Sequence, residues 1–290
     1  MTRIIDSLSD ISASYDAVFC DLWGCLHNGV NVFDSAVAAL QAFRASGGKV
    51  ILVTNSPRPR DQVAAQLDGL GAPRDCWDDI ATSGDSAQAA MVHGIVGQKV
   101  FHLGPERDMS FFTDLAEDLP TPEFTLVPLD EADGIVCTGL LDDTTETPDD
   151  YRGQLLLAKT KGLKMLCANP DIIVDKGDSR IYCAGALAQL YTEMGGESLY
   201  FGKPHPPIYD LARRRLSALA KVSDDRILAI GDGPGTDLAG AMGEDIDFLF
   251  VTGGIVAEQT GTDRQPDPDK LKAFLQQERL ATTFSVGHLR

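Results

Sequence analysis

The residues that could do chemistry stand directly after apolar runs of the sequence. In chain order they are Asp21 after residues 17–20, Thr54 and Asn55 after residues 49–53, Lys203 after residues 199–201, and Asp232 and Asp237 after residues 226–230. Short apolar runs of this kind are typical of buried parallel strands. Ligands of open α/β sheets bind outside the carboxyl ends of the strands. If these strands share one sheet, the side chains converge on one of its edges.

This set of groups suits phosphoryl transfer. Asp21 and Asp232 offer the hard oxygen ligands that Mg²⁺ takes together with a substrate phosphate. Thr54 and nearby backbone N–H groups can bind phosphate oxygens at a turn, and Lys203 supplies a point charge. A carboxylate at such a site is a competent nucleophile, as in enzymes that form an aspartyl-phosphate.

Each piece also has an ordinary explanation. Asp21 and Gly24 are common turn residues, residues 54–57 could form a simple turn, and a lysine before proline is often a surface residue. Residues 231–237 are harder to explain in this way. They contain three glycines and two carboxylates directly after a fully apolar run, which favours a functional loop.

The elements that must position these groups follow a strand–helix alternation. This order predicts an α/β protein with a doubly wound parallel-sheet, Rossmann-like core and a smaller inserted α/β domain. We expect the core to contain residues 1–82 and 184–290, and the inserted domain to contain residues 83–183. Residues 109–130 contain three prolines and predict no clear element.

Composition narrows the classes of protein that fit. The chain has 290 residues, is 43% hydrophobic and carries a formal net charge of −18, which argues against nucleic acid as a partner. Its six cysteines form no C-x-x-C pair, so reduced, structural thiols are expected instead of a zinc or disulfide framework. No apolar run approaches the ~18 residues of a membrane span. With no signal-like N-terminus, a cytoplasmic protein without a membrane partner is expected.

Taken in order, the motifs resemble those of the haloacid dehalogenase-like (HAD) superfamily of Mg²⁺-dependent phosphotransferases. The matching stretches are residues 17–24, 50–55, 201–204 and 227–237. The inserted domain resembles the class IIA, C2-type cap of p-nitrophenylphosphatases and of the N-acetylglucosamine-pathway phosphatase. Further similar stretches are residues 80–84, 168–171 and 202–209.

The resemblance implies a role for each motif residue. The implied catalytic residues are Asp21 as nucleophile, Lys203 and the supporting acid Asp237. The implied phosphate-binding residues are Thr54, Asn55 and Lys203, and the implied Mg²⁺ ligands are Asp21, the main-chain carbonyl of Trp23 and Asp232. A cap of this type is expected to face the substrate, and residues 142–147 and 169–171 are our candidates for that role.

One position departs from the family pattern. The first motif usually has a second Asp two residues after the nucleophile, which acts as general acid and base, and here that residue is Trp23. Losing such a group typically costs ~10²–10⁴ in rate. His27 and His205 are candidates for a substitute, because histidine transfers protons near neutral pH.

Two functions therefore stay open at this stage. The first is a phosphoric monoester hydrolase that acts on a small phosphorylated metabolite through an aspartyl-phosphate on Asp21, with an activity that the missing acid would weaken. The second is a binding or sensor protein of the same fold, with little or no turnover because of Trp23. A small receiver domain is disfavoured by the inserted domain. The sequence identifies neither the substrate nor the oligomeric state, and a homo-oligomer stays open.

Overall fold

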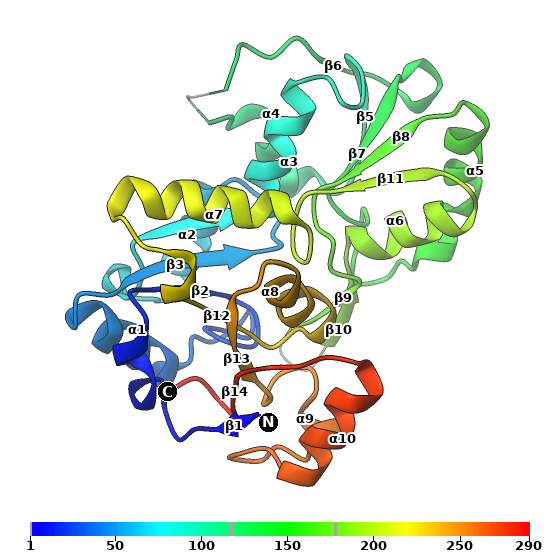
Figure 1. Cartoon of the computed structure of the whole chain (residues 1–290). Helices are drawn as coiled ribbons and strands as arrows, with labels where there is room; N and C mark the ends of the chain where they lie inside the picture. The colour runs from blue at the N-terminus through cyan, green and yellow to red at the C-terminus, as the bar shows by residue number, and fades with distance from the viewer. Residues whose placement is uncertain (1, 117–118, 177–178) are drawn as a thin grey trace. The chain divides into compact units, whose positions relative to one another are not determined.

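The computed structural model describes residues 2–116, 119–176 and 179–290 (Figure 1). These residues form two compact units. The first unit contains the chain up to Thr54, Ala64–Ala81 and Tyr209–Arg290, and the second contains Asn55–Val63 and Thr82–Ile208. Each unit has its own sheet, and these are described one after the other.

In the part of the chain that the structure describes, the first sheet has seven strands. Their order is β1 (Arg3–Ile4), β14 (Phe284–Val286), β13 (Asp247–Val251), β12 (Ile227–Gly231), β2 (Ala17–Cys20), β3 (Lys49–Thr54) and β4 (Asp79–Thr82). All pairs from β1 to β3 are parallel. The central strands β2 and β12 are buried along their whole length, as their continuous apolar runs predict.

Helices connect these strands. They are α1 (Asp34–Ala45), α2 (Arg60–Gly69), α7 (Pro206–Leu219), α8 (Ala239–Gly243), α9 (Ala257–Thr260) and α10 (Pro268–Glu278). Helix α1 illustrates the local cause: Ala36, Val37, Leu40 and Phe43 recur at helical spacing and are all buried. The sheet order and the connecting helices confirm the predicted α/β, doubly wound core.

The second sheet is also parallel. Among the described residues its order is β11 (Glu197–Tyr200), β8 (Lys164–Cys167), β7 (Gly134–Cys137), β5 (Lys99–Leu103) and β6 (Thr125–Leu126). Its helices are α3 (Ser83–Val92), α4 (Ser110–Thr113), α5 (Arg152–Thr160) and α6 (Ala184–Glu193). Strands β9 (Ile173–Lys176) and β10 (Ser179–Tyr182) form a separate antiparallel hairpin.

The second sheet has an apolar core on each face, because successive side chains of its strands alternate between the two faces. Ile135 and Met165 belong to a cluster that includes residues of α5 and α6, whereas Val136 and Leu166 belong to a cluster that includes residues of α3 and α4. Successive side chains of a strand point to opposite faces. A strand that is apolar at every position therefore needs helices on both sides.

The position of β11 differs from our expectation. We placed residues 184–290 in the core, but β11 pairs with β8 at the edge of the second sheet, and residues 184–208 group with the second unit. Lys203 therefore does not follow a strand of the same sheet as Asp21. The apolar run 199–201 was identified correctly as strand-like, but which sheet a strand joins depends on its distant partner and not on its own sequence.

The C-terminal region is more ordered than its sequence suggested. The amphipathic helix is present as α10, capped by Asp267, whose side chain accepts hydrogen bonds from the backbone N–H groups of Asp269 and Lys270. Beyond it, β14 joins the first sheet between β1 and β13, which the sequence had not predicted. No helix within the described residues has the length and apolar character of a membrane span.

Candidate active site

Asp21 and Asp232 stand at the carboxyl ends of two neighbouring strands. Strands β2 and β12 pair in parallel, with Cys20 opposite Ile230, and the N–H of Asp21 continues this ladder by donating to Ile230 O at 2.8 Å. Both carboxylates are more than nine-tenths buried. The sheet thus brings together two acids that are 211 positions apart in the sequence, as the strand-end pattern predicted.

The loop after β2 approaches Asp232 through a glycine. Gly24 has φ +74°, and a Cβ added there would overlap with the Asp232 carboxylate. A Cβ on Gly254, in the loop after β13, would overlap with the same carboxylate. The N–H of Ile255 donates to Asp232 Oδ2 at 3.2 Å. Asp232 is therefore enclosed by main chain on two sides, and both approaches need glycine.

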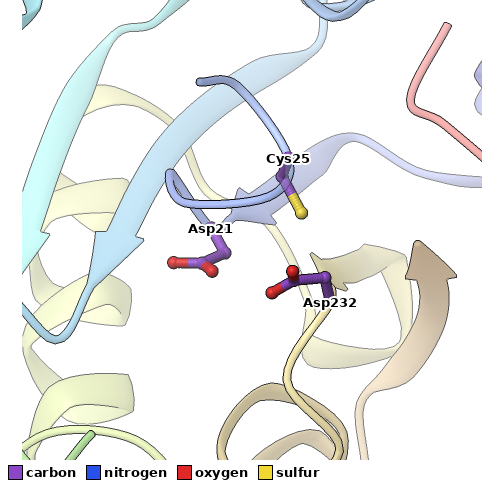
Figure 2. A group of neighbouring side chains, drawn as sticks. All are labelled: Asp21, Cys25 and Asp232. Carbon is purple, nitrogen blue, oxygen red and sulfur yellow. The ribbon is translucent and has the colours of Figure 1, made fainter. Parts of the chain in front are cut away.

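A thiol completes this cluster. The ligand atoms of Asp21, Cys25 and Asp232 all lie within 4.8 Å of one another, and all three side chains are buried (Figure 2). Burial and the nearby carboxylates of Asp232 and Asp21 raise the pKa of the Cys25 thiol well above its usual value. Cys25 therefore stays a neutral thiol beside the two acids.

The donor set fits a hard divalent cation. Two buried carboxylates this close repel each other in a chain that already carries a formal charge of −18, and a cation between them would remove that cost. Mg²⁺ is held in proteins by one or two carboxylates, with further oxygen ligands from water or substrate phosphate.

Asp237 lies in the loop that follows β12. Its Oδ2 accepts hydrogen bonds from the N–H of Gly233 at 3.2 Å and from the hydroxyl of Thr236 at 3.3 Å. A Cβ on Gly231 would overlap with the Asp237 side chain. These contacts hold the loop that carries Asp232, which is compatible with the supporting role predicted for Asp237.

Thr54 is the last residue of β3, the strand next to β2. It is 1% exposed, so a polar side chain is buried at the same carboxyl edge that carries Asp21. Its predicted contact with phosphate stays a prediction.

Trp23 occupies the position where the family pattern has its second acid. Its indole packs against Gly29, where an added Cβ would overlap with the ring, and it meets the ring of His27 edge-on at 5.1 Å. The side chain thus packs within its own loop. That the Trp23 carbonyl is a metal ligand stays a prediction.

His27 is a poor substitute for the missing acid. Its ring is 1% exposed, and its Nδ1 accepts a hydrogen bond from the N–H of Gly29 at 2.9 Å. Burial lowers the pKa of His27 to about 4. At neutral pH the ring is uncharged, so it has no extra proton to donate. The lone pair of Nδ1 is occupied by the hydrogen bond from Gly29, so this nitrogen does not readily accept a proton either. The hydrogen bond from Gly29 instead gives His27 a structural role within its own turn.

The second unit holds Asn55 and Lys203 together. Asn55 Oδ1 accepts a hydrogen bond from the N–H of Lys203 at 2.7 Å, and Asn55 Nδ2 donates to Lys203 O at 3.1 Å and to Asp171 Oδ1 at 2.8 Å. The amide is thus engaged through both N–H groups and its oxygen. A phosphate contact of Asn55, as predicted, would have to use its backbone N–H.

His205, the second histidine candidate, stacks on Tyr200 with ring centroids 5.1 Å apart and an angle of 9° between the rings. Burial lowers the pKa of His205, so this ring also favours its neutral form. The stacking gives His205 a packing role within the second unit.

Comparison with known proteins identifies the family. Residues 18–116 match the haloacid dehalogenase-like hydrolase family, and residues 200–274 match a HAD-hydrolase-like family. A haloacid dehalogenase-like hydrolase from Brucella suis 1330 is 41% identical, with a TM-score of 0.86 over 99% of this chain and 100% of that one. The chain belongs to the haloacid dehalogenase-like hydrolases. This confirms the predicted family, the α/β fold and the expectation of a hydrolytic enzyme.

Two further relatives of this HAD hydrolase have names that include a substrate. The fold of a possible sugar phosphatase from Cytophaga hutchinsonii matches over 99% of this chain and 98% of that one, at 20% identity and a TM-score of 0.78. An acid sugar phosphatase from Staphylococcus haemolyticus is 28% identical over 113 residues, which are 38% of this chain. The aligned part spans 41% of that phosphatase.

The sequence did not predict the contacts of two residues of the HAD hydrolase. Cys25 was treated only as a small apolar residue, although its position four residues after Asp21 placed it in the same loop. Asp171 was expected to face the substrate, but its carboxylate accepts a hydrogen bond from Asn55. The fold brings Asp232 close to Cys25 and Asn55 close to Asp171, so neither of these two contacts has a local signal.

Proposed function

We propose that this HAD hydrolase is a Mg²⁺-dependent phosphoric monoester hydrolase that acts on a small phosphorylated metabolite, with Asp21 as the nucleophile. The observation that carries the proposal is the pair of buried carboxylates, Asp21 and Asp232, that lie together at the carboxyl ends of adjacent strands. Among the described residues, the cluster that holds Asp21 contains a second acid and no histidine base, which favours phosphoryl transfer over acyl transfer.

In the proposed reaction an oxygen of Asp21 attacks phosphorus, and the bond from phosphorus to the alcohol oxygen breaks. The leaving oxygen takes a proton from solvent water and departs as the alcohol, and the phosphoryl group stays on Asp21 as a mixed anhydride. Water then attacks phosphorus, which releases inorganic phosphate and regenerates the carboxylate. Lys203 keeps the role that the family resemblance implies, a positive charge for the phosphate.

The proposed metal site consists of Asp21, the Trp23 carbonyl and Asp232. When bound, Mg²⁺ would neutralise the two carboxylates and polarise the phosphate oxygens. The protein's own part is to fix the two acids, through the β2–β12 ladder for Asp21 and through the Ile255 N–H for Asp232. Asp237 holds the loop that carries Asp232.

Sugar phosphates are the proposed first choice of substrate. Two relatives carry the name of sugar phosphatase, one by fold and one by partial sequence similarity. Residues 142–147 and 169–171 of the second unit stay our candidates for recognising the substrate. A cytoplasmic location is proposed together with this metabolic role.

The test is hydrolysis of a panel of phosphate esters, sugar phosphates and an aryl phosphate included, with and without Mg²⁺. Asp21→Asn keeps the size of the side chain but removes the nucleophile, so released phosphate should fall by at least ~10³-fold on every ester. Asp245→Asn is the matched control, because Asp245 is exposed at φ +55°, a conformation that Asn adopts readily. Equal activity of wild type and Asp21→Asn would refute the proposal.

A further inference from the structure

Three residues of the second unit form a hydrogen-bonded chain that ends at Lys203. Asp171 accepts from Asn55, and the Asn55 amide pairs with both the N–H and the C=O of Lys203. The sequence separations are 116 residues for the first pair and 148 for the second. A side-chain amide that binds both polar groups of one residue fixes that residue's main chain as a neighbouring strand would.

Asp171 selects the orientation of the Asn55 amide. If the amide turned over, its oxygen would face the Asp171 carboxylate and the Lys203 carbonyl, and its NH₂ group would face the Lys203 N–H. All three contacts would then be repulsive. The Asp171 carboxylate can accept hydrogen bonds but cannot donate them. Its contact with Asn55 at 2.8 Å therefore requires the NH₂ group of Asn55 on that side.

The main chain before Lys203 leaves no room for another arrangement. A Cβ on Gly202 would lie 2.5 Å from Asn55 Oδ1 and 2.6 Å from the Ser83 hydroxyl. Lys203 itself is 3% exposed and Asn55 is 2% exposed. The amide is therefore packed directly against the residues that it orients, and water cannot easily replace it.

Asp171 is in turn fixed by its surroundings. Its N–H donates to Asn169 Oδ1 at 3.0 Å, and its carbonyl accepts from the N–H of Gly185 at 3.1 Å, at the start of α6. A Cβ on Gly185 would lie 2.5 Å from the Asp171 carbonyl oxygen, so the helix approaches this turn closely. The chain of contacts thus starts from a helix of the second unit and ends at Lys203.

We propose that Asp171 is a positioning residue that acts through the Asn55 amide to set the main chain of Lys203. This inference rests on the proposed function in one respect, since it takes Lys203 as the lysine that serves the phosphate.

The test compares three variants with wild type. Asp171→Asn keeps the shape but removes the charge that selects the amide orientation. Asn55→Asp puts a second carboxylate beside Asp171, so the two acids repel each other. Asn55→Asp combined with Asp171→Asn restores a donor–acceptor contact between the two side chains. Asp149→Asn is the control, because the Asp149 side chain is exposed and pairs with the exposed Arg152 on the surface.

Two readouts are measured for each variant. The first is the kcat and KM of aryl phosphate hydrolysis. We expect kcat to fall ~10–100-fold in Asp171→Asn and further in Asn55→Asp, with a smaller change in KM. The double variant should recover at least ~10-fold over Asn55→Asp, which a merely structural role would not produce. The second readout is hydrogen exchange of the Lys203 amide, which should speed up ~10-fold or more in Asp171→Asn.

The two readouts separate the inference from the proposed function. If wild type hydrolyses no phosphate ester, the proposed function is wrong, and Lys203 exchange alone decides on the positioning role. If wild type is active but Asp171→Asn keeps both kcat and the slow exchange of Lys203, the positioning role is wrong. A thermal melt identifies any variant that fails to fold, and in that case Asp171→Asn and the double variant are judged by exchange. Additive losses in the double variant would also overturn the inference.

Discussion

The carboxyl edges of the two sheets hold their charged groups in opposite ways. In the first sheet, Asp21 and Asp232 follow adjacent strands, and two like charges lie within 4.8 Å of each other. In the second sheet, β7 is followed by Thr138, whose hydroxyl contacts His102 at 2.9 Å, and β11 is followed by the clamped main chain of Lys203. We propose that the first edge binds a cation, whereas at the second edge the Thr138 hydroxyl and the main chain of Lys203 contact neighbouring side chains.

The difference shows what each edge needs from outside. Two carboxylates this close repel each other unless a cation joins them or one of them binds a proton, so we propose that a bound cation completes the first edge. At the second edge, the main-chain groups of Lys203 and the hydroxyl of Thr138 have hydrogen-bond partners within the same unit. We therefore expect the first unit to respond to Mg²⁺ and the second unit to respond to changes in its hydrogen bonds.

The largest expected effect comes from Asp232→Ala. Without this carboxylate the cluster loses one of its two charged ligands, so Mg²⁺ binding should weaken by at least ~10³-fold, and hydrolysis should be lost with it. Isothermal calorimetry measures the binding. In wild type, Mg²⁺ at 100 times its Kd should stabilise the fold by about 2.7 kcal/mol, and in the variant this stabilisation should vanish.

Lys203→Met is the counterpart in the second unit and sharpens the comparison. It should reduce hydrolysis, but Mg²⁺ should still bind and still raise the melting temperature.

The outcome that would contradict the proposed metal site concerns the first of these two variants. Unchanged Mg²⁺ binding in Asp232→Ala would show that the metal is held elsewhere.

The strand ends of the first sheet were predictable because their signal is local. An apolar run marks a buried strand, and an acid directly after it lies at the ligand-binding edge, so Asp21 and Asp232 could be paired before the structure was known. The α/β fold and the family followed from the same motifs in order. The roles of the site residues, however, stay predictions until activity and metal binding are measured.

What the sequence could not provide depends on distant partners. Strand β11 looks like a core strand, but its pairing with β8 places it in the second sheet. The three-residue strand β14 is too short to show a pattern of its own. The Asn55 amide finds Lys203 across 148 residues, and no spacing rule predicts such a contact. Local patterns therefore identify elements, whereas tertiary contacts decide which element serves which site.

Trp23→Asp tests the position that departs from the family pattern. His27 is neutral and its Nδ1 is occupied, so this ring does not replace the missing acid. Restoring an acid should raise the turnover of alkyl phosphates by up to ~10²-fold. The gain should be smaller for aryl phosphates, because an aryloxide can leave without being protonated.

The control for this change is Trp23→Phe, which keeps an aromatic ring near Gly29 without adding an acid. Melting curves must accompany both variants, because removing the indole leaves a cavity. A folded Trp23→Asp protein with no gain on any ester would defeat the missing-acid explanation.

Acidification should destabilise both units, because each buries a neutral histidine. Burial lowers the pKa of His27 and of His102 to about 4. In the unfolded chain the pKa of histidine is about 6.5, so the unfolded state binds more protons below that value, and stability falls as the pH decreases from 6.5 towards 4. Between pH 7 and pH 5 His27 alone should cost about 2 kcal/mol, and the less buried His102 a smaller amount.

Urea unfolding at pH 7 and pH 5 measures this loss. His27→Gln and His102→Gln should each reduce the difference between the two pH values, the first by more than the second. An identical pH difference in wild type and in both variants would contradict the assignment to these rings.

The smallest expected effect comes from single methyl groups placed at each edge. In Gly254→Ala the backbone needs no positive φ, but the new Cβ overlaps with the Asp232 carboxylate, so Mg²⁺ affinity should fall about tenfold. In Gly202→Ala the new Cβ lies 2.5 Å from Asn55 Oδ1, so Lys203 amide exchange should rise while Mg²⁺ affinity stays unchanged. Gly243→Ala, which meets nothing within 4 Å, is the control. If Gly202→Ala weakened Mg²⁺ binding as much as Gly254→Ala, the two edges would not be independent, and the contrast between an edge that needs a cation and one that satisfies itself would fail.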